Sequence, residues 1–169
     1  MSKYHDFTVE PISLDEKDKA ILEELHKDCR ETLTNISRRT GIPVDTIRYR
    51  IDRMKEQEVF EYAVIVNPLK LGYPIFNALY LQLTNFTQAR EEQLRAYIQK
   101  HPHLVYSAKV MGKYDFVVGI VAQNMLAFNA ISNEFRTAFE DIIKDFDVLS
   151  VIDEFKYDYL MDLMGDKGN

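Results

Sequence analysis

The chemically active side chains of this sequence are concentrated in a run of six basic residues, five of them arginine, between Arg38 and Lys55. Only Asp45 and Asp52 oppose them, so this stretch has a net charge of +4 in a chain whose total is −6. Arginine presents a planar fork of donors that matches phosphate oxygens and the edge of guanine. Charges farther away than about 8–10 Å are largely screened, so the local charge decides what binds here. The stretch indicates a nucleic-acid contact, with a solvated helix face as the alternative.

Signatures of catalysis and of metal binding are nearly absent. The sequence has no glycine-rich phosphate loop, no His-x-x-x-His pair and no Gly-x-Ser-x-Gly motif. His101 and His103 flank Pro102 at the end of a predicted helix, where the helix dipole alone favours histidine. The single cysteine, Cys29, excludes an intrachain disulfide and is predicted to be a small core residue. We therefore expect no enzyme, no catalytic residue, no metal and no cofactor.

The composition indicates a folded protein outside the membrane. The chain has 169 residues, of which 46% are hydrophobic and 28% charged, enough for one ordinary domain or two small ones. No apolar run approaches the roughly 18–20 residues of a membrane-spanning helix, and no signal sequence is recognisable. We expect a cytoplasmic protein.

The basic run lies within three predicted helices. Ser13 and Glu16 match a capping box, which predicts a first helix over residues 15–28. Thr32 and Gly41 are suited to begin and end a short second helix. After Pro43, apolar residues at i, i+4 and i+7 predict the buried stripe of a third helix: Ile47, Ile51 and Met54. Three helices in about 45 residues, the last two joined by a glycine turn, are typical of a helix-turn-helix.

After Glu58 the sequence becomes rich in β-branched and aromatic residues, which predicts a strand over residues 59–66. The remaining elements follow the order β-α-β-β-α-β of a ferredoxin-like domain. Their expected ranges are a strand at 75–83, a helix at 88–101, a hairpin of strands 105–111 and 114–122, a helix at 125–144 and a strand at 148–159. The predicted class is α+β: a winged helix-turn-helix at 1–60, a β linker at 61–73 and a ferredoxin-like domain at 74–169.

Taken together, these segments resemble the Lrp/AsnC family of transcription regulators over about residues 14–155. The resemblance is carried by residues 14–22 (LDEKDKAIL), 36–42 (ISRRTGI) and 47–54 (IRYRIDRM), then 64–72 (VIVNPLKLG) and 110–116 (VMGKYDF). The sequence departs from the family pattern in three places, one of which is the tail after Tyr157 (DYLMDLMGDKGN), which has no counterpart in that pattern. Pro43 replaces the usual serine before the third helix, and Glu58 replaces the glycine that usually ends it.

The resemblance implies that the third helix enters the major groove of double-stranded DNA. The implied base contacts are Val44, Asp45, Thr46, Arg48 and Tyr49, and the implied phosphate contacts are Arg38, Arg39, Arg50 and Arg53. Internal ion pairs, for example with acids of the first helix, are the alternative for Arg50 and Arg53. Asp45 is expected to cap its helix.

For the second domain, the resemblance implies a sheet-to-sheet homodimer, assembly of dimers into octamers, and a small effector that is usually an amino acid. The implied effector residues are Gly112, Tyr114, Asp115 and Met125. Roles of Gly112 and Asp115 in the hairpin turn alone are the alternative.

Two other functions remain open at this point. Siroheme decarboxylase subunits resemble the same two-domain architecture, but the sequence offers only His101 and His103 for a tetrapyrrole pocket. The second is an assembly module whose helix-turn-helix has lost DNA binding, which the concentration of arginine disfavours.

Overall fold

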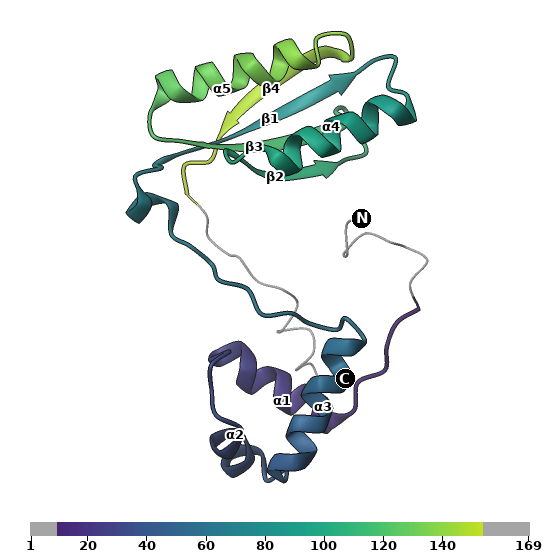
Figure 1. Ribbon diagram of the computed structural model, residues 1–169, viewed down its shortest axis with the longest axis vertical. Helices are drawn as coiled ribbons and strands as arrows, with labels where there is room; N and C mark the ends of the chain where they lie inside the picture. Colours follow the sequence, from purple (N-terminus) through teal and green to yellow (C-terminus); the bar gives the residue numbers. More distant parts are fainter. Residues whose placement is uncertain (1–9, 154–169) are drawn as a thin grey trace. The chain divides into compact units, whose positions relative to one another are not determined.

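The computed structural model describes residues 10–153, which form two compact units divided between Val64 and Ile65 (Figure 1). The first unit contains α1 (Glu16–Lys27), α2 (Leu33–Thr40) and α3 (Val44–Glu56). Each helix contributes one apolar side to a shared core, composed of Ile21, Leu22, Leu25, Ile36, Ile42, Ile47, Ile51 and Met54. This is the predicted helix-turn-helix. Within residues 10–153, no helix is long and apolar enough to cross a membrane.

The N-cap of the first helix is Asp15 rather than Ser13, and the helix begins at Glu16, one residue later than predicted. Asp15 is the N-cap, its carboxylate accepts from the backbone N–H of Asp18, and the Asp18 carboxylate accepts from the N–H of Asp15 in return. The two carboxylates satisfy free backbone N–H groups at the start of α1 and interact favourably with the helix dipole. The prediction that Cys29 is a core residue is wrong, because α1 ends before it and Cys29 is exposed.

The two turns that frame α3 require left-handed backbone. Gly41 ends α2 with φ 73°, as its position predicted. Glu58 follows α3 with φ 55°, while the N–H of Val59 donates to the Met54 carbonyl and the N–H of Glu58 donates to the Lys55 carbonyl. These two bonds make a Schellman motif, which glycine usually completes. α3 therefore ends in the usual geometry despite the missing glycine.

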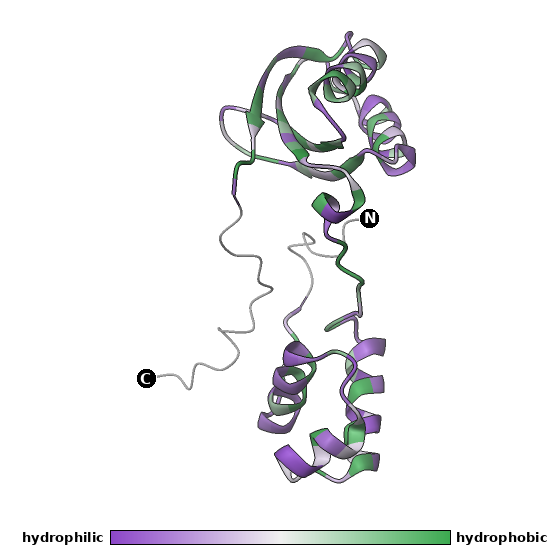
Figure 2. Cartoon of the chain, turned by 90° about the vertical axis from the view of Figure 1, so that its left-hand side faces the viewer, coloured by the Kyte–Doolittle hydropathy of each residue, from purple (hydrophilic) through white to green (hydrophobic). Residues whose placement is uncertain are grey.

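The strand predicted at residues 59–66 is not formed, and neither is a wing built on it. The segment has no ladder partner among residues 10–153, and Val64 and Ile65 are 91% and 77% exposed. A strand needs a second strand to satisfy its backbone groups, and β-branched composition cannot supply one. Figure 2 shows this hydrophobic stretch in green. The segment leads into a 3-10 helix, η1 (Pro68–Leu71).

The second unit has the predicted ferredoxin-like topology. Its elements are β1 (Ile75–Leu83), α4 (Gln88–Lys100), β2 (Leu104–Lys109), β3 (Phe116–Ala122), α5 (Met125–Ala138) and β4 (Ile143–Ser150). The strands form one antiparallel sheet in the order β2-β3-β1-β4, and α4 and α5 cover the same face of it (Figures 1 and 2).

The boundaries of the last helix and strand differ from those expected. α5 ends at Ala138 rather than near residue 144, and β4 begins at Ile143 rather than Val148. Phe139 and Ile142 are both buried, so the turn between the two elements continues the apolar spacing of the helix. From the sequence, the continuous apolar spacing therefore predicted one long helix where the structure has α5 followed by a turn. Residues 154–159, the rest of the predicted strand, lie outside the described residues.

The register of β1 assigns its alternating residues to different faces of the sheet. Leu79 and Leu81 pack in the core beneath the helices, while Phe76, Ala78 and Tyr80 lie on the other face, which no helix of the unit covers. Beside them, Gly119 on β3 has no side chain, and a Cβ there would lie 2.7 Å from Cε2 of Phe76. The glycine lets the Phe76 ring lie across the sheet, so this open face is apolar and closely packed.

Candidate functional site

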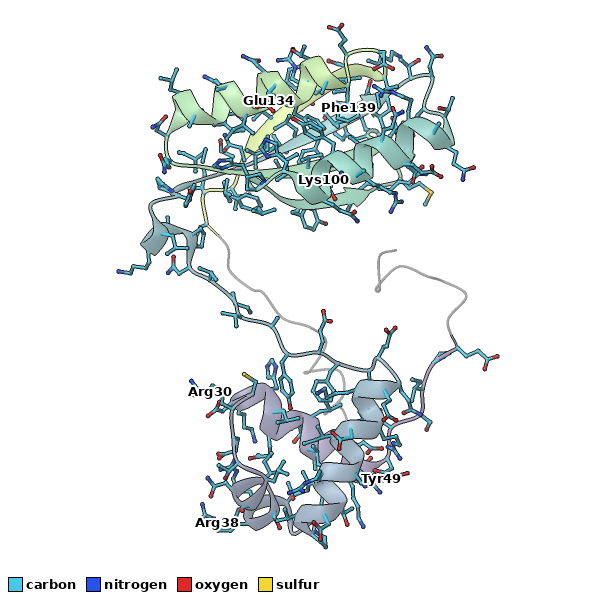
Figure 3. All side chains as sticks on the ribbon, in the orientation of Figure 1. Arg30, Arg38, Tyr49, Lys100, Glu134 and Phe139 are labelled. Carbon is cyan, nitrogen blue, oxygen red and sulfur yellow. The ribbon has the colours of Figure 1, made fainter. Side chains whose placement is uncertain are left out.

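The candidate nucleic-acid contact is the exposed side of α3. The buried stripe of Ile47, Ile51 and Met54 fixes which side of this helix faces the core. Because each residue advances about 100° around a helix, the opposite side presents the side chains of Asp45, Arg48, Tyr49 and Asp52. All four are exposed, and Tyr49 is 67% exposed (Figure 3). Val44 and Thr46, the other implied base contacts, are half-buried in the first turn.

Asp45 does not cap α3. The N-cap is Pro43, which makes no side-chain cap hydrogen bond, and Asp45 lies one position inside the first turn. A carboxylate in that turn still interacts favourably with the helix dipole. Its side chain also projects to the exposed side, where it can accept from a donor of DNA or repel phosphate.

Two of the arginines with an implied phosphate contact form ion pairs within the unit. Arg50 donates through Nη1 to both oxygens of Asp15 at 2.7 Å and to Oδ1 of Asp18 at 2.8 Å. Arg53 donates through Nη2 to Oδ2 of Asp18 at 2.6 Å. The internal alternative, pairing with acids of the first helix, is the arrangement in the structure.

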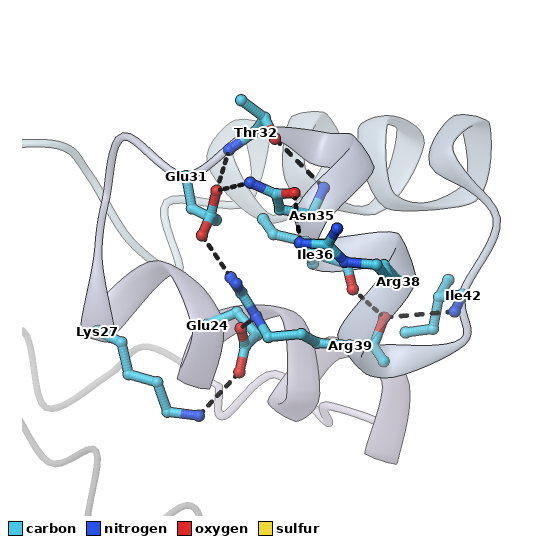
Figure 4. A network of polar contacts seen from close by, with 10 residues as sticks. Glu24, Lys27, Glu31, Thr32, Asn35, Ile36, Arg38, Arg39 and Ile42 are labelled. Carbon is cyan, nitrogen blue, oxygen red and sulfur yellow. Dashed lines mark hydrogen bonds and ion pairs between the residues drawn. The ribbon is translucent and has the colours of Figure 1, made fainter.

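Arg39 is held by a second polar network, between α1 and α2 (Figure 4). It donates through Nε to Glu24 and through Nη2 to Glu31 at 2.7 Å. Glu24 is nearly buried and also pairs with Lys27 at 2.8 Å. The structure does not test a contact between Arg39 and a phosphate, which would require this guanidinium to leave two carboxylates.

Arg38 and Arg48 remain as the arginines of α2 and α3 without a carboxylate partner among residues 10–153. Arg38 donates to Oδ1 of Asn35 at 2.9 Å, and Arg48 forms no side-chain hydrogen bond or ion pair with any described residue. Both are exposed. Lys55, farther along α3, lies with Nζ 5.5 Å from the centre of the Tyr62 ring. Among the arginines of α2 and α3, Arg38 and Arg48 are therefore the ones available to a ligand from solution.

The same networks lower the pKa values of the carboxyl groups that form them. Hydrogen bonds from Arg50 and from the backbone of Asp18 lower the pKa of Asp15 to about 2. Hydrogen bonds from Asn35, Arg39 and the backbone of Thr32 lower the pKa of Glu31 to about 2. At neutral pH these groups are anions, so they cancel the charge of the arginines they hold.

Two of the residues that organise this unit, Asp18 and Glu24, were not among the predicted site residues. Both are buried acids on α1, at 1% and 7% exposure. Their sequence signal is weak, because an amphipathic helix carries many acids and only the packing shows which are buried. A buried carboxylate needs a cationic partner, and α2 and α3 supply the arginines.

In the second unit, the implied effector residues Gly112 and Asp115 lie together in the connection between β2 and β3. This connection spans residues 110–115, longer than a two-residue hairpin turn, and Gly112 has φ 147°. Asp115 bonds to β1: its Oδ2 accepts from the N–H of Leu83 at 2.7 Å, and its own N–H donates to the Leu81 carbonyl. The carboxylate thus has a structural task at the end of β1.

The structure brings Tyr114 beside this connection but places Met125 elsewhere. Tyr114 donates to the Asp147 carboxylate on β4, accepts from Lys113 at 2.8 Å and packs against Tyr80. Tyr114 and Lys113 lower the pKa of Asp147. Met125 begins α5, beyond the far end of β3. Seven residues of strand, about 20 Å, separate it from the other three, so one protomer does not gather all four.

The two histidines that could have contributed to a tetrapyrrole pocket bond to the backbone instead. Nδ1 of His101 accepts from the N–H of His103, and Nδ1 of His103 lies 3.1 Å from the Val121 carbonyl. In the part of the chain that the structure describes, no cluster of three or more histidine, cysteine, aspartate or glutamate side chains could hold a metal ion.

Comparison with known proteins gives a consistent family. The model of the AsnC-type helix-turn-helix domain matches residues 14–55. The HTH-type transcriptional regulator FL11 of Pyrococcus furiosus is 35% identical over 117 residues, which cover 69% of this chain and 76% of that protein. The HTH-type transcriptional regulator LrpA of Pyrococcus horikoshii is 41% identical over 63 residues, 37% of this chain and 45% of that protein.

Solved structures share the fold over nearly the whole chain. An AsnC family transcriptional regulator from Agrobacterium tumefaciens matches with a TM-score of 0.80 at 18% identity, over 89% of this chain and 99% of that one. A transcriptional regulator from Neisseria meningitidis, in complex with L-Met, matches with a TM-score of 0.78 at 20% identity over the same shares. At these identities the structures show the fold, while the family follows from the sequence relatives: this chain belongs to the Lrp/AsnC family of transcriptional regulators.

Proposed function

We propose that this regulator binds specific DNA sequences through α3, with Arg48 and Tyr49 at base edges and Arg38 at a phosphate. The observation that supports this most directly is the exposed side of α3, where Arg48 is free of any carboxylate partner among the described residues. A guanidinium without an internal partner can form a bidentate contact with guanine, and an exposed tyrosine ring can pack against a thymine methyl group.

The binding unit on DNA is a homodimer. Its support is the open face of the sheet, where Tyr106 and Leu149 are 53% and 54% exposed beside Phe76 and Tyr80. A second copy would cover this apolar face, as the family resemblance implies. Two symmetry-related α3 helices then select a pseudo-palindromic site with half-sites about 10 bp apart. Assembly of dimers into octamers, also implied by the family, is compatible with this unit.

Selection of bound fragments from random DNA tests this function. We expect enrichment of an inverted repeat, and gel shifts on the enriched site should weaken steeply with salt because phosphate contacts release counterions. Lack of affinity for any DNA at low ionic strength would contradict the proposal. Arg48→Ala should bind without preference at one base pair of each half-site, while Arg38→Ala should bind all sequences less well.

We further propose that the 110–115 connection contributes to a site for a small effector, an amino acid. Its support is the Asp115 carboxylate, which uses one oxygen for the Leu83 N–H and keeps the other for an ammonium group. The regulator from Neisseria meningitidis that shares the fold is described in complex with L-Met. An amino acid offers an ammonium group to Asp115 and a carboxylate to backbone donors near Gly112.

Calorimetric titration with individual amino acids tests the effector site. Asp115→Asn should weaken effector binding roughly tenfold to a hundredfold, because the charged hydrogen bond is lost while an amide oxygen still accepts from Leu83. Asp145→Asn on β4 is the matched control and should bind as wild type does. If no amino acid binds, or if Asp115→Asn binds equally well, the carboxylate has only its structural task.

A further inference from the structure

Asp18 occupies an unusual position in the helix-turn-helix, at the point where α1 meets α3. Its side chain is 2% exposed, and each of its two oxygens accepts from a different arginine of α3. Oδ2 also accepts from the backbone N–H of Asp15, so the carboxylate is fixed to the first turn of α1. One buried anion therefore joins the start of α1 to two residues on the inner flank of α3, Arg50 and Arg53.

We infer that Asp18 is a positioning residue of DNA recognition: its carboxylate fixes the rotation of α3 and keeps Arg50 and Arg53 away from phosphate. The inference rests on the proposed DNA binding by α3. Asp18 itself is too deeply buried to reach DNA, so it acts through the two arginines.

The rotation of α3 follows from the spacing of its two arginines. Arg50 and Arg53 are three residues apart, on adjacent turns of the same flank of the helix, and both reach the same carboxylate. The apolar stripe packs by shape alone and tolerates small rotations, whereas two ion pairs to one fixed anion do not. These contacts therefore set the direction in which the side chains of Arg48 and Tyr49 project from α3.

Moving Arg50 or Arg53 from Asp18 to a phosphate has a cost in free energy. Removing Arg50 or Arg53 from Asp18 would leave a buried carboxylate short of a partner, which is unfavourable in a region excluded from water. Arg53 already uses Nη2 for Asp18 at 2.6 Å, and its Nε is buried with no hydrogen-bond partner among residues 10–153. Of the arginines on α3, Arg48 alone is left to contact DNA, so base contacts outweigh phosphate contacts on this helix.

Gel-shift titrations of the full chain with Asp18→Asn test the inference, on the selected site and on random DNA between about 50 and 200 mM salt. Release of Arg53 should make the log–log salt slope steeper by about one unit, whereas Arg50 keeps its bonds to Asp15. The ratio of specific to non-specific affinity should fall roughly tenfold, because Arg48 is no longer held at one angle. Wild-type slope and ratio in a folded Asp18→Asn protein would overturn the inference.

Asp52→Asn is the matched control, since it removes the same charge from the exposed side of α3 without releasing an arginine. It should strengthen binding to both DNAs and leave their ratio unchanged. A triple variant, Asp18→Asn with Arg50→Gln and Arg53→Gln, should return the slope to the wild-type value while the ratio stays low. A merely structural role for Asp18 predicts instead a wild-type slope in both variants.

If Asp18→Asn does not fold, the single variant Arg53→Gln tests the inference, because it shows whether Arg53 contacts a phosphate in the wild-type protein. We expect its salt slope to equal that of wild type, and a slope flatter by about one unit would show a phosphate contact and overturn the inference. A wild-type protein without DNA affinity would remove the proposed function and this inference together. A wild-type protein that binds DNA, with variants that differ from these expectations, would remove the inference alone.

Discussion

At the scale of single residues, the charge of the helix-turn-helix differs from what its composition suggests. Arginines of similar appearance in the sequence have different surroundings: Arg39 and Arg50 each touch two carboxylates, whereas Arg48 touches none among residues 10–153. The carboxylates come from α1 and from the turn before α2, outside the basic run itself. A residue's availability to DNA therefore depends on its internal partners.

Substituting Arg48 and Arg39 separately should reveal this difference. Arg48→Ala should cost about 1–3 kcal/mol of discrimination at one base pair. Arg39→Gln should leave both salt slope and base preference unchanged and lower the melting temperature slightly, since its partners lie within the unit. Gel shifts on the selected site and on singly substituted sites measure both quantities. A flatter slope for Arg39→Gln would instead place this residue at a phosphate.

The lowered pKa of Glu31 predicts a loss of stability in acid. Asn35 and Arg39 bond to the carboxylate in the folded protein and hold its pKa at about 2, against 4.5 ordinarily. Between these values the unfolded chain binds the proton more readily, so the free energy of unfolding should fall as pH decreases from about 5 to 2. Thermal unfolding of wild type and Glu31→Gln checks this. The variant should be less stable at pH 6 and lose less on acidification, and parallel curves would contradict the role of Glu31.

At the scale of elements, sequence periodicity predicted what local interactions determine. β1 has the predicted bounds, Thr32 and Gly41 frame α2 as expected, and the order of elements from Ile75 onward is confirmed. The errors occur where a longer-range partner decides. The segment predicted as a strand at 59–66 pairs with no strand within residues 10–153, and α5 is shorter than expected because Ile142 packs in the core of the second unit. The ion pairs of Asp18 depend on how α1 meets α3.

The end of α3 offers an element-scale test, because Glu58 adopts a conformation that glycine adopts without strain. Glu58→Gly should raise the free energy of unfolding by up to about 1 kcal/mol. Glycine removes the backbone strain of a left-handed residue in the folded state, and the greater entropy that it gives the unfolded chain offsets part of this gain. Gly41→Ala, at the corresponding turn after α2 with φ 73°, should lower it by about 1 kcal/mol. Chemical denaturation measures both. Destabilisation by Glu58→Gly would mean that the side chain contributes more than its backbone strain costs.

At the scale of the whole molecule, each unit leaves apolar surface that its own elements do not cover. Val64 and Ile65, where the two units meet in the sequence, are exposed, and the second unit has an open sheet face. Ion pairs within the helix-turn-helix neutralise Arg39, Arg50 and Arg53, so these side chains do not drive association of two copies. The apolar surfaces are the features that favour self-association, and a dimer is what a pseudo-palindromic DNA site requires.

Leu149→Asp tests self-association directly. Leu149 lies on the open face, paired with Ala78 of β1, and a charge there opposes burial by a second copy without disturbing the core beneath the helices. We expect sedimentation to show dissociation toward the monomer at concentrations where wild type is associated. Affinity for the two-half-site DNA should fall more than affinity for a single half-site, because the dimer gains from binding both at once. Leu126→Asp, an exposed position on α5 on the helical side of the sheet, is the control. If Leu126→Asp dissociates the assembly and Leu149→Asp does not, the copies meet through the helices, and the open face has another use.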